Sequence, residues 1–157
     1  MRFGEALHRQ LAVLETSLPR GALTTADAVA LRDARARAEF ANISGKQIEM
    51  LPGRSHTVVI DADESFQPSC LNRFVYVKPV RDVRDVIAQL RPVRDYLQSV
   101  AWSGVAEKQA TELGLELGRL GVSRITSFAH LPWPPLDWHH DGSRPLGELL
   151  RWVDWEA

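Results

Sequence analysis

The chain has 157 residues, of which 45% are hydrophobic and 25% charged, as in an ordinary globular protein. Its net charge of −1 gives no reason to expect nucleic acid or an anionic membrane as a partner. The single cysteine excludes an internal disulfide and a cysteine-based zinc site. No apolar run approaches the ~20 residues of a membrane span. Because residues 1–18 are also too charged for a signal peptide, we expect a cytoplasmic location.

The first 40 residues carry two helical patterns. Apolar side chains at helical spacing predict an amphipathic helix over residues 2–17, with Phe3, Leu7, Leu11 and Leu14 on its apolar face. Thr24 followed by Asp27 is a variant capping box, which predicts a second helix from about 25 to 40. The candidate buried positions of that helix are Val29, Leu31, Ala38 and Phe40.

Residues 46–127 alternate between strand and helix patterns. After a short segment at 47–51, β-branched residues predict a strand at 56–60. Further strands are predicted at 73–77, 96–102 and 122–127, with helices at 83–90 and at 106–120, the latter closed by Gly121. Short connections between alternating strands and helices predict an α/β fold with a parallel sheet flanked by helices.

The C-terminal residues hold four of the five tryptophans, between paired prolines. Tryptophan is rarely left in solvent, so we expect residues 128–157 to form a docking tail. Within it, 146–153 is predicted to be helical, with Leu149, Leu150 and Val153 facing inward. We interpret 1–157 as a single domain, helical over 1–45 and α/β over 46–127. Since no strand precedes the first helix, we expect the later part of a larger domain.

Several motifs, in order along nearly the whole chain, carry a family resemblance. They are LNRFVYV from 71, KPV from 78, YLQSV from 96, LGVSRI from 120, PPLDWHHDG from 134 and LRWVD from 150. The chain resembles the C-terminal part of the LuxC-type acyl-CoA reductases, members of the aldehyde dehydrogenase superfamily. The resemblance implies part of an aldehyde-dehydrogenase-like catalytic domain with a Trp/Pro-rich C-terminal tail.

The resemblance also implies a reaction. Such reductases transfer the acyl group of an acyl-CoA to a cysteine and reduce the acyl-enzyme with NADPH to an aldehyde, in bioluminescent bacteria the long-chain aldehyde used by luciferase. In the family the nucleophile and the nucleotide-binding half lie upstream of the region matching this chain. We therefore expect a C-terminal portion that is inactive alone. Its expected partners are the N-terminal reductase half or other subunits, and an acyl-transferring enzyme.

Two residues match the positions at which aldehyde dehydrogenases contact the nicotinamide and its ribose. The resemblance implies that Phe74 packs on the nicotinamide and that Asn72 hydrogen-bonds a ribose hydroxyl. Asn72 replaces the glutamate that is usual there. The alternative is that Phe74 is a core residue of a strand in which Phe74 and Tyr76 share a face.

The run His139-His140-Asp141 has three interpretations. A metal would need a third ligand such as His130 or His56, and adjacent residues rarely face one ion, so we predict no metal site. A histidine paired with Asp141 would suit a general base or a contact to a CoA phosphate. Alternatively, the run holds the proline-rich loop in place.

Cys70 follows Pro68-Ser69 in a predicted turn. No helix N-terminus precedes it to lower its thiol pKa, so we interpret it as structural and assign no catalytic residue to this chain. The tryptophans are interpreted as docking anchors. A second hypothesis is that the chain is a non-catalytic binding or scaffolding module that kept the fold.

Overall fold

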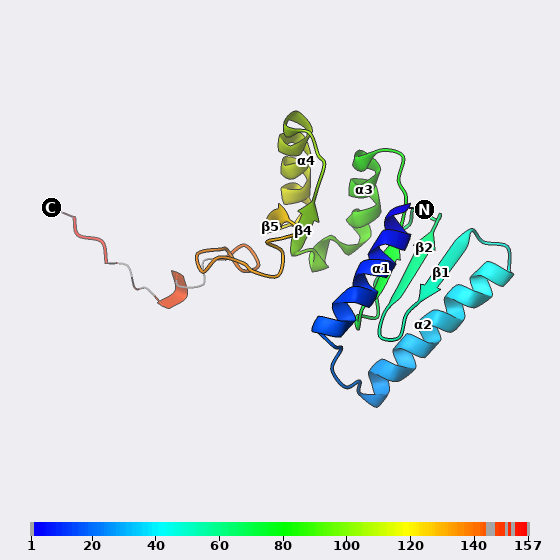
Figure 1. The fold of residues 1–157 in the computed structure, drawn as a ribbon. Helices are drawn as coiled ribbons and strands as arrows, with labels where there is room; N and C mark the ends of the chain where they lie inside the picture. Colours follow the sequence, from blue (N-terminus) through cyan, green and yellow to red (C-terminus); the bar gives the residue numbers. More distant parts are fainter. Residues whose placement is uncertain (1, 144–146, 150, 152, 157) are drawn as a thin grey trace. The chain divides into compact units, whose positions relative to one another are not determined.

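A computed structural model describes residues 2–143, 147–149, 151 and 153–156. The chain forms two compact units, Met1–Arg81 and Asp82–Ala157, and each is described by itself (Figure 1). The interpretation of residues 1–157 as one domain stays a prediction, because two compact units can belong to one domain.

The first unit begins with two helices, both predicted. Helix α1 spans Arg2–Ser17 and α2 spans Thr25–Ile43. The capping box is confirmed, because Thr24 Oγ1 accepts a hydrogen bond from the Asp27 backbone and the Asp27 carboxylate accepts one from the Thr24 backbone. These bonds satisfy backbone donors that the first turn of a helix leaves unpaired.

Three strands follow in the order β1-β2-β3. The hairpin of β1, Ile48–Pro52, and β2, Thr57–Asp61, is antiparallel, whereas β3, Phe74–Val77, runs parallel to β2. The parallel pairing aligns Thr57 with Phe74 and Val59 with Tyr76. Since side chains alternate along a strand, these four residues share one face of the sheet.

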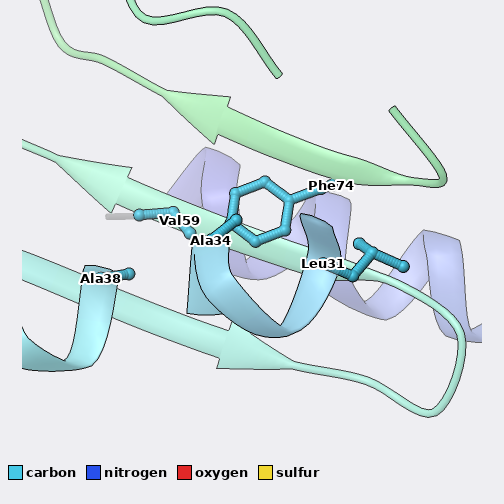
Figure 2. Packing of buried hydrophobic residues seen from close by; sticks show 5 residues of the cluster. All are labelled: Leu31, Ala34, Ala38, Val59 and Phe74. Carbon is cyan, nitrogen blue, oxygen red and sulfur yellow. The ribbon is translucent and has the colours of Figure 1, made fainter. Parts of the chain in front are cut away.

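The two helices cover opposite faces of this sheet. Leu31, Ala34 and Ala38 of α2 pack on Val59 and Phe74, as Figure 2 shows with α1 behind the sheet. On the α1 face, a Cβ atom added to Gly4 would lie 2.5 Å from Ile60 Cδ1, so the helix comes very close to β2. The unit is a helix–sheet–helix sandwich.

Two of the candidate buried positions of α2 are wrong, and part of the apolar face of α1 is exposed. Phe3 is 65% exposed and Leu14 40%, because α1 turns Gly4 rather than its most apolar face to the sheet. In α2 the buried positions are 31, 34 and 38, and this spacing leaves Val29 and Phe40 exposed.

The second unit holds α3, Val83–Leu90, a 3₁₀ helix over Arg91–Tyr96, β4, Ser99–Trp102, α4, Glu107–Leu120, and β5, Arg124–Ser127. The bounds of α3 are those predicted. Strand β4 starts three residues later than predicted because the chain around Pro92 continues from α3 as a 3₁₀ helix.

Strands β4 and β5 pair in parallel as a separate two-stranded sheet, so the predicted parallel pairings occur in two sheets rather than one. The core of the unit consists of Leu113, Leu117 and Val122, with partly buried residues of α3, β4 and β5 packed around it. Gly121 ends α4 with φ of 112°, the left-handed cap predicted for it.

The tail contains a short 3₁₀ helix, Gly147–Leu149. Leu149 is 79% exposed and Val153 82%, so the prediction that they face inward is wrong: no part of the chain that the structure describes covers them. Leu150 and Leu146 lie outside the described residues. Within the described ranges, no helix has the length and apolarity needed to cross a membrane.

Candidate functional site

The most unusual backbone of the first unit lies immediately before β3. Leu71, Asn72 and Arg73 are all left-handed, with φ of 65°, 52° and 61°. A left-handed conformation costs a residue other than glycine roughly 1–2 kcal/mol, with asparagine the most tolerant. Three in succession persist only where other contacts enforce them, and such segments are concentrated at functional sites.

Hydrogen bonds enforce this turn from several sides. The Phe74 amide donates to the Leu71 carbonyl at 2.9 Å, and the Leu71 amide donates to Ser69 Oγ at 3.0 Å. The Ser69 hydroxyl donates in turn to the Phe74 carbonyl. The Arg73 guanidinium reaches the carbonyl of Leu18 at 2.6 Å, which ties the turn to the loop after α1.

Asn72 ties the same turn to the start of α2. Its Nδ2 donates to Asp27 Oδ1 at 3.2 Å, while the other carboxylate oxygen of Asp27 accepts the capping bonds from Thr24. The Thr24 bonds, and then that of Asn72, lower the pKa of Asp27, so this carboxylate is charged at neutral pH. The predicted cofactor-binding residue Asn72 thus donates a hydrogen bond to the carboxylate that caps α2.

Phe74 occupies the core position that the sequence left open as an alternative. It is 2% exposed and is enclosed by Leu31, Ala34, Ala38 and Val59 (Figure 2). Its ring therefore offers no face on which a nicotinamide could stack while α2 stays in place. Of the two predicted cofactor contacts, only the half-buried Asn72 is partly accessible.

A pair of histidines lies on the α1 face of the sheet. His56 Nε2 is 3.0 Å from His8 Nδ1, and His56 is 1% exposed. Burial lowers the pKa of His56, and the neighbouring His8 lowers it further. Three buried side-chain atoms around this region, Ser55 Oγ, His56 Nδ1 and an Arg73 terminal nitrogen, have no hydrogen-bond partner among the described residues.

A groove lies beside α2, toward the carboxyl ends of β2 and β3, where ligands of parallel sheets commonly bind. It has a volume of about 580 Å³ and combines apolar lining from Phe40, Ile48 and Tyr76 with the carboxylates of Asp61 and Asp63. Asp61 forms an ion pair with Lys78 at 2.6 Å, with side chains only 8% and 14% exposed. The groove is thus apolar along one side, and its formal charges balance because Arg37 and Lys46 line it together with the two aspartates.

The predicted histidine run belongs to the second unit and is exposed there. His140 Nδ1 lies 3.0 Å from Asp141 Oδ2, and Gln98 Nε2 donates to Asp141 Oδ1 at 2.7 Å. The His140 ring packs edge-on against the Trp138 ring. The Arg124 guanidinium lies over the Trp138 ring, 5.3 Å from its centroid. These contacts hold the loop against β5 and against the residue before β4, whereas His139 has no such contact among the described residues.

The family model of the acyl-CoA reductases (LuxC) matches residues 2–152. The chain belongs to the LuxC acyl-CoA reductase family. The predicted resemblance is confirmed, and with it an oxidoreductase family that acts on acyl-CoA thioesters. No curated protein matches the chain at the significance required of a relative.

Cys70 of this LuxC-family chain packs against the core of the first unit. It is partly buried against the cluster that contains Phe74, next to the left-handed turn. The interpretation of Cys70 as structural stays a prediction. Across the described ranges, no group of three histidine, cysteine, aspartate or glutamate side chains is arranged to hold a metal ion.

Sequence reasoning missed the histidine pair and the buried ion pair of this LuxC-family chain. His8 and His56 are 48 residues apart, and Lys78 lies 17 residues after Asp61. The sequence carries only weak signals for these two pairs. His8 follows Gly4 by one helical turn, and Asp61 ends a run of β-branched residues at which a charge needs a partner.

Proposed function

We propose that this chain is the C-terminal part of an NADPH-dependent fatty acyl-CoA reductase that forms an aldehyde through a cysteine acyl-enzyme. The observation that carries the proposal is the family match over residues 2–152, which leaves few residues of the chain outside it. The motifs from 71 to 77 and from 134 to 142 support the same assignment.

The proposed reaction has two balanced steps. A cysteine thiolate attacks the thioester carbonyl and releases the CoA thiolate, leaving an acyl-enzyme. Bound NADPH would supply a hydride to the acyl carbonyl, so that the aldehyde would leave, the enzyme thiolate would be regenerated and NADP⁺ would be formed. We assign neither the nucleophile nor the side chain that stacks on the nicotinamide to this chain, because Cys70 packs against the core and Phe74 offers no ring face.

The contribution of this chain is structural support around the reacting groups. Asn72 remains the candidate contact to the cofactor ribose, since the amide nitrogen bound to Asp27 leaves its carbonyl oxygen as an acceptor. His140 and Asp141 remain the candidates for a substrate contact or a structural loop. Their exposed pair suits either role.

We expect the partner to be the cysteine-bearing, nucleotide-binding part of the reductase. Apolar side chains in and just after α1 support this proposal, because Phe3 and Val13 of the helix and Leu18, the residue after it, are each more than half exposed. In the tail, Trp133 is 77% and Trp155 91% exposed. Apolar surface of this extent favours contact with another protein segment.

The test is reconstitution. Purified chain mixed with a LuxC-type N-terminal half is expected to oxidise NADPH when acyl-CoA is added, whereas either part alone does not. Cys70→Ala should leave the reconstituted rate unchanged. Activity of the chain alone that disappears in Cys70→Ala would overturn the proposal and make Cys70 the nucleophile.

The exposed tail favours a second candidate, a non-catalytic binding module. Its tryptophans would then contact a partner such as an acyl-transferring enzyme. The two candidates differ in the DNA upstream of the codon for Met1. An open frame that encodes the cysteine motif supports the reductase portion, whereas an independent promoter without such a frame supports the module.

A further inference from the structure

A second groove of the first unit is lined mainly by arginines. It has a volume of about 420 Å³ and lies along α2, with apolar side chains of Leu23, Ala28 and Leu31 in its lining. Its charged lining residues are Arg20, Arg32, Arg35, Arg54 and Glu39. Four cations thus face one carboxylate.

Two of these arginines are held in place by the turn between β1 and β2 and by the first residue of β2. Arg35 Nε donates to Thr57 Oγ1 at 2.8 Å, and Arg20 donates to the Ser55 carbonyl at 3.2 Å. Each guanidinium has five N–H donors, so both retain donors for a ligand. Because their side chains are already ordered, a ligand would bind them at a small entropic cost.

The arginines are largely free of carboxylate partners. Arg32 pairs with Asp33 at 3.3 Å, but this pair is exposed and weak. Among the described residues, Arg20, Arg35 and Arg54 have no carboxylate within ion-pair distance. The groove therefore carries an excess of positive charge that an anion would neutralise.

A cleft of the second unit provides the contrast. It has a volume of about 440 Å³ and is lined by Arg94 and Arg119, but also by Asp95 and Asp141. Its formal charges balance, so it offers no comparable attraction to an anion. Size alone does not distinguish the two clefts, whereas charge does.

We propose that the arginine groove binds the ribose-phosphorylated adenosine end of a nucleotide ligand. Guanidinium groups match phosphate oxygens in geometry and charge, and the apolar lining suits a base. CoA and NADPH share this chemistry, differing in which ribose hydroxyl is phosphorylated. The choice of these two sources rests on the proposed reductase function, whereas the phosphate site itself rests on the charges of the groove.

The test is titration calorimetry of the full chain with adenosine 3′,5′-bisphosphate, adenosine 2′,5′-bisphosphate and adenosine. Both bisphosphates are expected to bind more tightly than adenosine, and less tightly as salt is added. Preference for the 3′ isomer assigns the groove to CoA, and preference for the 2′ isomer assigns it to NADPH.

Variants locate the binding. Arg54→Gln and Arg32→Gln each remove one cation without removing a long-range hydrogen bond of the fold, and each should weaken binding about tenfold. Arg9→Gln is the matched control, since Arg9 is exposed on α1 and does not line the groove. Glu39→Gln removes the carboxylate that lines the groove, so it should have the opposite effect and tighten binding.

The proposal is overturned if the bisphosphates bind no better than adenosine, or if Arg54→Gln and Arg32→Gln bind as Arg9→Gln does. Binding that depends on these arginines in a chain that cannot be reconstituted into a reductase would support the groove and refute the reductase proposal. A reconstituted reductase with no bisphosphate binding by the chain would refute the groove alone.

Discussion

The two parallel strand pairs of this chain differ in how they are covered. In β2, Thr57, Val58, Val59 and Asp61 are buried, because α1 and α2 lie on opposite faces of that sheet. No residue of β4 is buried, and β5 ends exposed at Ser127. The same alternation of strand and helix patterns in the sequence has therefore given one sheet that is enclosed and one that is half covered.

The difference teaches where this chain can sustain buried polar groups. Among the described residues, the buried polar and charged ones are Ser55, His56, Thr57 and Asp61, and they all belong to the first unit. Burying such groups is costly unless they are paired, so a two-faced sheet is needed to hold them in fixed positions. All five tryptophans follow Asp82, so their fluorescence monitors the second unit separately.

The largest expected effect is loss of the Phe74 ring. Phe74→Ala removes the largest side chain of the core beneath α2 and should lower the free energy of unfolding by about 3–5 kcal/mol. This loss is measured by chemical denaturation, with circular dichroism as the signal. Tryptophan fluorescence should keep its midpoint if the units unfold independently. A parallel fall in both signals would show that the two units unfold together.

Breaking the ion pair between Lys78 and Asp61 should cause the second largest loss of stability. Lys78→Met leaves a carboxylate that is 8% exposed without its cation, at a cost of about 3 kcal/mol, measured by denaturant unfolding. The matched control is Arg84→Met, which breaks the exposed pair with Glu112 in the second unit and should cost less than about 1 kcal/mol. Equal losses would remove the contrast between the two units.

Glycine substitutions should have opposite signs in the two units. A Cβ atom at residue 53 would lie 2.1 Å from His56 Cε1, so Gly53→Ala should destabilise the first unit by about 1–3 kcal/mol. At Gly118, inside α4, a Cβ atom meets nothing within 4 Å. Gly118→Ala should raise the stability of the second unit by about 0.5–1 kcal/mol, seen as a higher midpoint of tryptophan fluorescence.

The smallest expected effect is a pH dependence. Burial lowers the pKa of His56 below 6.5, so below that pH the unfolded chain binds more protons than the folded one. The neutral His56 side chain contributes its full share to the free energy of unfolding above about pH 6.5. This contribution falls as the pH decreases toward the lowered pKa. Thermal unfolding by circular dichroism between pH 7.5 and 5.5 measures the slope. His56→Gln should flatten it, and an unchanged slope would assign the dependence to other groups.

Local signals in the sequence were sufficient for the ends of several helices. The Thr24 capping box, the bounds of α3 and the cap at Gly121 depend on residues within a turn of each other, so neighbours in sequence determine them. The start of β4 was predicted at Tyr96 because the strand-forming residues after it hid the 3₁₀ helix that includes Pro92.

The buried face of α1 was beyond the sequence pattern. Periodicity identifies the most apolar face, which includes Phe3 and Leu14, but the close approach to β2 is made through Gly4. The site shows the same division. The family motif pointed to Asn72, whereas its bond to Asp27 spans 45 residues and depends on tertiary packing.

The turn at Leu71–Arg73 holds three successive residues in the left-handed region of φ. For an L-residue this region is unfavourable, but for a D-residue it is the ordinary helical region. Chemical synthesis of the first unit with D-alanine at position 71 should therefore preserve the turn. Among natural residues, glycine, asparagine and aspartate are the replacements that this backbone tolerates best. The handedness of three residues thus restricts which sequences can present Asn72 at this position.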